Sequence, residues 1–349
     1  MNQIRIKEAV LTPFVQTLLC KAGVHPAEAA CMAPVFVWMD LIGRRLHGIS
    51  RLPALIKRLK LGLINSPCDP EMTCPTRTLA IIDGKNGFGQ YLGHLAMSEA
   101  ISMARQHGVG VVGVRGSNHF GAGAYYVHLA ANHQQIGIAM SNSVPKVAPF
   151  GGVQPVLGTN PFAFGAPAFK GRPILADFST SAIPGSKVLE AIAEERSLPE
   201  GLVVDAQGKS IVDPNHIGNG ALLPFGGPKG FCVGLMVEIL SGVLTGAGVS
   251  HGVASMYEDF SRPANSGHFF VALDLAQFMP LPLYYERIAQ LLALIKAAGK
   301  AGEAEGVLIP GETRWRIFSE QKVKGVLIDQ KTAAGLTILA QQYRVAVPW

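Results

Sequence analysis

A histidine and an arginine stand four residues apart near the start of the chain, at His47 and Arg51 in the segment RRLHGISRLP. If this segment is helical from His47, the spacing places both side chains on one face. Hydride reduction of a 2-oxo acid needs a proton donor at the carbonyl oxygen and a forked cation for the adjacent carboxylate. An imidazole and a guanidinium supply these two groups. The alternative is a basic surface helix, because further cations surround the pair: Arg44, Arg45, Lys57, Arg58 and Lys60.

Several glycine-flanked polar turns follow predicted strands and are candidates for ligand contact. They are GSNHFGAGAYY (116–126), GTNPFAF (158–164), DFSTS (177–181) and GGPKG (226–230). The first opens a predicted helix, whose free N–H groups and dipole favour an anion. Lys229 in the last can meet a phosphate or carboxylate. A polar capping loop is the alternative for the first turn.

A G-x-G-x-x-G string at Gly108, Gly110 and Gly113 has the letters of a dinucleotide fingerprint but the wrong surroundings. That fingerprint follows a strand and opens a helix, whereas this string follows a helical segment and is itself rich in valine. We therefore predict a glycine-containing buried strand. The segment DGKNGFGQYLG (83–93) does lie between a strand and a helix, so it fits either a ligand contact or a tight turn.

Hydrophobic periodicity predicts a mixed α/β chain that begins with helices and continues with alternating strands and helices. Helices are expected in 4–45 and 47–61, followed by a loop to residue 77. A β-α-β unit is expected at 78–83, 91–107 and 109–115. Further helices are expected at 125–132, 188–195, 231–249, 284–298 and 331–343, further strands at 136–141, 162–167, 174–179 and 268–275, and a hairpin within 198–214.

Composition excludes several classes of protein. With 48% hydrophobic and 15% charged residues among 349, the chain is not disordered, and the low charge favours an oligomer. The net charge of +6 comes without a basic block, so no nucleic-acid partner is expected. No metal-ligand cluster is visible. Five cysteines without CxxC, and no signal-peptide pattern, indicate a cytoplasmic protein.

The apolar segment Phe231–Val249 approaches the length of a membrane span, but it contains Glu238 and four glycines. We expect no membrane association for the chain. A helix buried in a large core is the preferred interpretation of this segment.

Taken together, these strings resemble one family. HGISRLP, DGKNGFGQ, GSNHFGAGAYY, LGTNPFAF, DFSTS, LPFGGPKG, LMVEILSGVLTGA and a final PGE occur in order over residues 4 to 330. They are similar to the malate/L-lactate dehydrogenase family, which includes ureidoglycolate, diketogulonate and sulfolactate dehydrogenases and piperideine-2-carboxylate reductase. The resemblance implies hydride transfer between NAD or NADP and a small 2-oxo or 2-hydroxy acid, in a homodimer.

The resemblance also implies a fold and a domain arrangement. The fold is α/β (α+β), with a non-Rossmann nucleotide-binding domain built on a mostly antiparallel sheet. An N-terminal helical segment, 1–76, is expected to pack with residues 300–349. The region 77–299 is expected to hold the nucleotide and the substrate.

Site residues follow from the same resemblance. His47 matches the proton donor and acceptor, Arg51 the carboxylate partner, and Thr159 a substrate contact. The expected nucleotide contacts are His119, Phe120, Gly121, Ala122, Gly123, Asp177, Phe178, Ser179, Lys187, Pro228, Lys229, Pro310, Gly311 and Glu312.

Three positions depart from the pattern of this family. Leu46 stands where a serine usually precedes the histidine, Gly185 replaces a basic residue after the S-T-S string, and Pro228 replaces a histidine in GGHKG. Imine-reducing relatives have an aspartate where Lys187 stands, which argues against a ketimine substrate. A cyclic imino-acid reductase and a non-catalytic homologue remain the alternatives.

Overall fold

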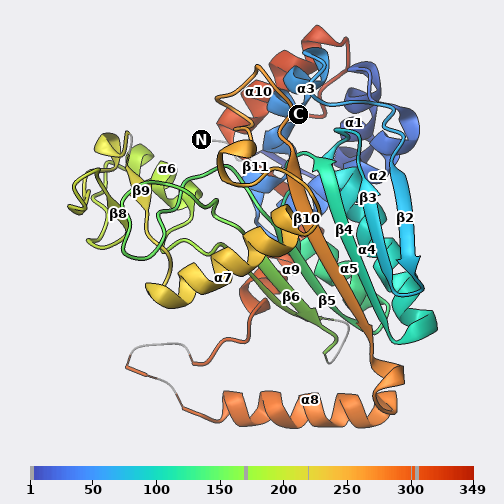
Figure 1. Cartoon of the computed structure of the whole chain (residues 1–349). Helices are drawn as coiled ribbons and strands as arrows, with labels where there is room; N and C mark the ends of the chain where they lie inside the picture. Colours follow the sequence, from blue (N-terminus) through green and yellow to red (C-terminus); the bar gives the residue numbers. More distant parts are fainter. Residues whose placement is uncertain (1–3, 169–171, 219, 300, 303–305) are drawn as a thin grey trace.

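One large sheet organises the computed structural model, which describes residues 4–168, 172–218, 220–299, 301–302 and 306–349 (Figure 1). Its seven strands run in the order β2-β3-β4-β10-β5-β6-β7. Their bounds are β2 Glu71–Thr76, β3 Leu79–Asp83, β4 Val109–Ser117, β5 Gln135–Ser141, β6 Phe162–Ala166, β7 Ile174–Phe178 and β10 Ser266–Asp274. Only β3 and β4 pair in parallel, so the sheet is mostly antiparallel, as expected.

Helices α4 (Gly89–His107) and α5 (Gly123–Asn132) pack behind this sheet in Figure 1. The G-x-G-x-x-G string lies at the end of α4 and in β4, as a strand rather than a phosphate loop. At Gly110 a Cβ atom would lie 2.1 Å from the Ala100 carbonyl oxygen of α4. This glycine therefore allows close packing of helix and strand.

A second core joins the two ends of the chain. It contains α1 (Glu8–Lys21), α2 (Pro26–Leu41), α3 (Leu52–Lys60) and α10 (Gln330–Gln342). The short strands β1 (Ile4–Ile6) and β11 (Val326–Ile328) pair antiparallel beside them. Helix α9 (Glu312–Lys324) contacts α2. These elements hold the segment that carries His47 and Arg51.

A smaller lobe lies beside the sheet (Figure 1). It contains α6 (Gly185–Ala193) and the two-stranded pair β8 (Val203–Val204) and β9 (Ala221–Leu222), with its own apolar cluster. The predicted hairpin within 198–214 is confirmed in part, because Val204 forms an antiparallel bridge with Ser210 and the Ile211 N–H donates to the Val203 carbonyl oxygen, while β8 also pairs with β9. The predicted loop before residue 78 was wrong in part, because β2 forms there as an edge strand.

The apolar segment 231–249 differs from its prediction as one buried helix. It forms α7 (Pro228–Glu238) and then a π-helical turn, η5 (Ile239–Val243). One face of it is exposed, including Leu235, Ile239 and Val243. No described helix is both long and apolar enough to cross a membrane.

Helix α8 (Leu281–Lys296), which confirms the helix predicted at 284–298, lies apart from the sheet, and none of its residues is buried (Figure 1).

Candidate functional site

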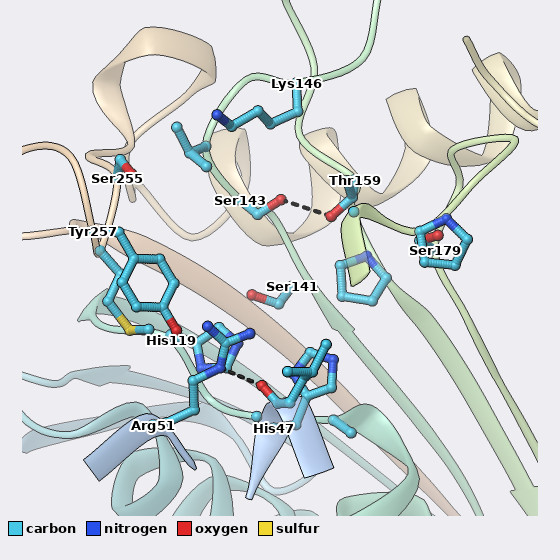
Figure 2. Close-up of a pocket in the computed structure, with 18 of the residues that line it drawn as sticks. His47, Arg51, His119, Ser141, Ser143, Lys146, Thr159, Ser179, Ser255 and Tyr257 are labelled. Carbon is cyan, nitrogen blue, oxygen red and sulfur yellow. Dashed lines mark hydrogen bonds between the residues drawn. The ribbon is translucent and has the colours of Figure 1, made fainter. Parts of the chain in front are cut away.

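A cavity of about 1470 Å³ opens where the sheet, the small lobe and the N-terminal helices meet (Figure 2). Ten of the sequence-predicted site residues line it. They are His47, Arg51, His119, Phe120, Gly121, Ala122, Thr159, Asp177, Phe178 and Ser179. Three of the polar turns noted in the sequence therefore converge on one hollow.

The other predicted contacts lie outside the residues that line this cavity: Gly123, Lys187, Pro228, Lys229, Pro310, Gly311 and Glu312. Lys187 is exposed and pairs with Glu190 at 2.6 Å. The carbonyl oxygen of Pro310 accepts a hydrogen bond from the Leu175 N–H on β7, so the PGE turn packs on the strand that contains Asp177.

His47 and Arg51 do not share one face of an α-helix, which corrects the spacing argument. They end two consecutive 3-10 turns, η1 (Arg45–His47) and η2 (Ile49–Arg51), which meet at Gly48. The Asp40 carboxyl group at the end of α2 accepts a hydrogen bond from the Ile49 N–H at 2.8 Å. A Cβ atom at Gly48 would lie 2.0 Å from Asp40 Oδ2, so only glycine fits here. The buried Asp40 thus fixes the bend that carries the pair.

The His47 imidazole lies parallel to that of His119, with ring centroids 5.5 Å apart. Burial, together with the charges of Arg51 and Arg44, lowers the pKa of His47 to about 3. His119 has its pKa lowered well below the usual range by burial and by Arg51. Both rings are therefore neutral at pH 7 in the free protein. Each has a buried Nδ1 atom without a hydrogen-bond partner in the described structure.

The Arg51 guanidinium has no acidic partner among the ion pairs of the described residues. Its Nε atom donates to the Leu46 carbonyl oxygen, and its Cζ atom lies 5.0 Å from the Tyr257 ring centroid. Burial lowers its pKa to about 10, so it stays charged at pH 7. An unpaired, largely desolvated cation in a cavity is a favourable partner for a ligand carboxylate.

Asp177 on β7 is paired with Arg44 at 3.3 Å, and Arg44 also donates to the Asp177 carbonyl oxygen at 2.6 Å. Burial raises the pKa of Asp177, while the Arg44 charge opposes this shift. Arg44 is therefore part of the cavity wall, and the surface-helix alternative fails for this residue.

Behind the cavity wall, the buried Glu238 carboxylate holds two asparagines. Asn160 donates to its Oε2 at 2.7 Å and Asn142 to its Oε1 at 3.4 Å, while the Ser250 N–H donates to Oε1 at 2.8 Å. The Asn160 Oδ1 atom accepts from the Ser143 N–H at 3.1 Å. This network fixes the segments that present the Ser143 and Thr159 hydroxyls, which lie 3.4 Å apart in the cavity (Figure 2).

We expect Glu238→Gln to lower the free energy of unfolding, because it disrupts the hydrogen bonds behind the cavity wall. An amide offers one acceptor where the carboxylate has two, so one buried donor among its three partners loses its acceptor, at a cost of about 1–3 kcal/mol. Urea denaturation measures the change in the free energy of unfolding. The exposed Glu286→Gln is the control, with an expected change within about 0.5 kcal/mol. Equal stability of the two variants would contradict the network's role.

A second prediction concerns Asp40 and the pH dependence of the free energy of unfolding. Burial raises its pKa to about 8, whereas a free aspartate titrates near 3.9. Its contribution to stability is therefore complete below about pH 4 and is lost as the pH rises to about 8. Asp40→Asn removes this titration, so its unfolding free energy should fall less than that of the wild type between pH 4.5 and 8.5. Parallel pH slopes in urea denaturation would contradict this assignment.

Sequence reasoning missed four parts of the site. No local sequence pattern indicated the roles of Asp40, Glu238 and the Arg44–Asp177 ion pair. Each role depends on a contact with a residue outside its own segment. The loop Val253–Glu258 also lines the cavity, although the sequence of 251–262, HGVASMYEDFSR, is typical of an ordinary surface loop. Among the described residues no three His, Cys, Asp or Glu side chains form a metal-binding group.

A family model, curated relatives and solved structures all relate this chain to one family of dehydrogenases. Residues 6–337 match the family model described as malate/L-lactate dehydrogenase. The chain is 36% identical over 332 residues to the malate/(S)-sulfolactate dehydrogenase of Methanothermus fervidus, covering 95% of this chain and 96% of that one. It is 41% identical over 307 residues to the L-sulfolactate dehydrogenase of Methanocaldococcus jannaschii, covering 87% and 88%. The crystal structure of malate dehydrogenase from Entamoeba histolytica superposes with a TM-score of 0.94 at 28% identity, covering 100% of both chains.

Proposed function

Because the chain belongs to the malate/L-lactate dehydrogenase family, it is a hydroxy-acid oxidoreductase, and we propose that His47 and Arg51 are its catalytic pair. The substrate is a small 2-oxo acid or the matching 2-hydroxy acid, and the hydride carrier is NAD or NADP. One observation carries this proposal above the others. An unpaired guanidinium stands beside a half-buried imidazole in the same cavity.

The cavity fits a nicotinamide nucleotide as well as a small acid. Its volume of about 1470 Å³ exceeds the usual 300–1,000 Å³ of a small-molecule pocket, which supports two ligands side by side. Hydroxyl groups that suit ribose and phosphate line it at Ser141, Ser179 and Ser181. We place the nucleotide along the His119–Ala122 turn and the strand end Asp177–Ser179, and propose that it binds in this mostly antiparallel, non-Rossmann setting.

The nucleotide supplies or accepts the hydride at C2 of the substrate. Arg51 pairs with the substrate carboxylate, which orients C2 toward His47. In oxidation, the neutral His47 accepts the hydroxyl proton as that bond breaks. In reduction, the protonated ring returns a proton to the carbonyl oxygen. Binding of the carboxylate offsets the Arg51 charge that holds the His47 pKa down, so substrate binding favours proton uptake by the ring.

The direct test is oxidation of NADH and NADPH by the purified protein in the presence of pyruvate, oxaloacetate, sulfopyruvate and diketogulonate. Turnover of one of these acids is the expected result, and it also identifies the preferred nucleotide. Piperideine-2-carboxylate belongs in the same panel, and its reduction in place of every oxo acid would favour the imino-acid alternative. Nucleotide binding without turnover of any compound would contradict the proposed pair.

We also propose that the protein is a homodimer and that the exposed face of α7 and η5 belongs to its interface. Leu235, Ile239 and Val243 recur every four residues on that face and are 41%, 47% and 58% exposed. Contiguous apolar surface of this kind marks interaction sites. All five cysteines are unpaired, which supports a reducing compartment such as the cytoplasm.

The dimer proposal predicts the effect of a charge on this face. Ile239→Glu should convert a particle of twice 37.0 kDa into one of 37.0 kDa in light scattering coupled to size exclusion. Val323→Glu is the control, because Val323 is also exposed but lies on α9. A wild-type monomer, or a dimer that persists in Ile239→Glu, would contradict the proposed interface.

A further inference from the structure

The loop Val253–Glu258 forms one wall of the cavity, and the family resemblance gives it no role. Its six residues all line the cavity. Figure 2 shows Ser255 and Tyr257 on the same side of the cavity as Arg51, with Ser179 on the opposite side. The loop therefore faces the position proposed for the substrate carboxylate.

The base of this loop is fixed by α3, the helix that follows Arg51. Arg58 is fully buried and donates to the carbonyl oxygens of Asp259 at 2.7 Å, Arg262 at 2.9 Å and Ser255 at 3.4 Å. Lys57 lies 3.9 Å from the centroid of the Phe260 ring. One helix thus positions both the carboxylate partner and the wall beside it.

The tip of the loop reaches Arg51 directly. The Tyr257 ring centroid lies 5.0 Å from the Arg51 Cζ atom, within the range of a cation–π contact. The neighbouring Glu258 lies 3.4 Å from Lys146 on another wall of the cavity. Tyr257 remains 52% exposed, so it contributes little to the core and its position serves the cavity.

The geometry of an arginine–carboxylate pair decides what this ring does to a substrate. Such pairs form two parallel N–H···O bonds, with the carboxylate close to the guanidinium plane. Because the Arg51 Nε atom already donates to Leu46, the two terminal NH₂ groups remain for the substrate. Because the Arg51 Cζ atom lies over the Tyr257 ring, 5.0 Å from its centroid, this ring also borders the position of a carboxylate held by Arg51 and of the adjoining C2. A 2-oxo acid with at most one substituent at C3 can turn that substituent away from the ring, whereas a second substituent at C3 projects toward it.

We propose that Tyr257 is a specificity-determining residue that restricts the enzyme to 2-oxo acids without a branch at C3. This inference rests on the proposed function, because it takes Arg51 as the partner of the substrate carboxylate. The favoured class is that of pyruvate, oxaloacetate and sulfopyruvate. The disfavoured class is that of 3-methyl-2-oxobutanoate.

The experiment compares kcat/KM for the best unbranched acid and for 3-methyl-2-oxobutanoate in the wild type, Tyr257→Ala and Tyr257→Phe. We expect the wild type to prefer the unbranched acid by about 10- to 200-fold, the range that one alkyl group allows. Tyr257→Ala should reduce this preference about tenfold, and its KM for the unbranched acid should rise several-fold with little change in kcat. Tyr257→Phe keeps the ring and should keep the preference.

Tyr285→Ala on α8 is the matched control, since it removes a tyrosine outside the cavity and should leave the preference unchanged. An unchanged preference in Tyr257→Ala would overturn the inference, as would equal relaxation in Tyr257→Phe. If the wild type reduces no 2-oxo acid, the proposed function itself fails. If it reduces one and the preference does not respond to Tyr257, only this inference fails.

Discussion

Replacing His47 by glutamine lowers kcat for reduction of the 2-oxo acid by about 10²- to 10⁴-fold, the usual contribution of a positioned general acid. Glutamine keeps a hydrogen-bonding group of similar length but cannot transfer a proton at neutral pH. The Arg51 guanidinium and the nucleotide contacts remain, so KM for the acid and the Kd of the nucleotide should change little. Steady-state kinetics and nucleotide fluorescence titration measure these quantities separately.

The control for this variant is His133→Gln, because His133 is an exposed histidine that does not line the cavity. It should keep the wild-type kcat. If His47→Gln retains turnover within a few-fold of the wild type, another group transfers the proton and the proposed role of His47 is wrong.

The low pKa of His47 adds a dependence on pH with a definite sign. Burial and the Arg51 and Arg44 charges lower this pKa to about 3 in the free protein. Reduction uses the protonated ring, so kcat/KM for the oxo acid should fall as pH rises. Oxidation uses the neutral ring, so its kcat/KM should reach a plateau once the pH exceeds the pKa. Profiles from about pH 3 to about pH 9 in both directions check the two signs, because the acidic limb of the oxidation profile lies near the low end of this range.

The sequence could predict which residues meet but not how the chain brings them together. His47, His119, Thr159 and Asp177 belong to strings that end strands or precede helices, and such positions gather at one edge of a sheet. The mostly antiparallel sheet followed from family resemblance and agrees with the strand pairing. The G-x-G-x-x-G string was assigned correctly as a strand because its neighbours in sequence decide its role.

The errors share a physical cause, which is tertiary contact overriding local pattern. Residues 47–61 have helical periodicity, yet the Ile49 N–H donates to the Asp40 carboxyl group instead of to a helical carbonyl oxygen. The chain therefore forms two 3-10 turns before α3 begins. Apolar composition in 231–249 predicted burial within the chain, but one face of α7 and η5 is exposed, the face that we propose a second copy covers. No pattern within a single segment contains the information that a carboxylate from another helix will supply the acceptor.

The second large effect concerns Arg51. Arg51→Gln should lower kcat/KM for the 2-oxo acid by about 10²- to 10⁴-fold, because two charge-assisted hydrogen bonds of about 1.5–3 kcal/mol each are lost. Most of this loss should appear in KM. Arg51→Lys keeps the charge without the fork, so its loss should be smaller than that of Arg51→Gln but still clear. The exposed Arg105→Gln, which lies outside this cavity, should match the wild type.

A second readout separates the charge of Arg51 from any general damage to the site. Arg51 holds the pKa of His47 down, so Arg51→Gln should raise that pKa and move the acidic limb of the oxidation profile to higher pH. Arg51→Lys keeps a positive charge and should leave the limb nearly unmoved. A merely structural defect would lower the rate at every pH and shift neither profile. An unshifted limb in Arg51→Gln, with KM unchanged, would show that the two side chains do not act on one substrate, because both effects follow from their placement beside a single carboxylate and carbonyl.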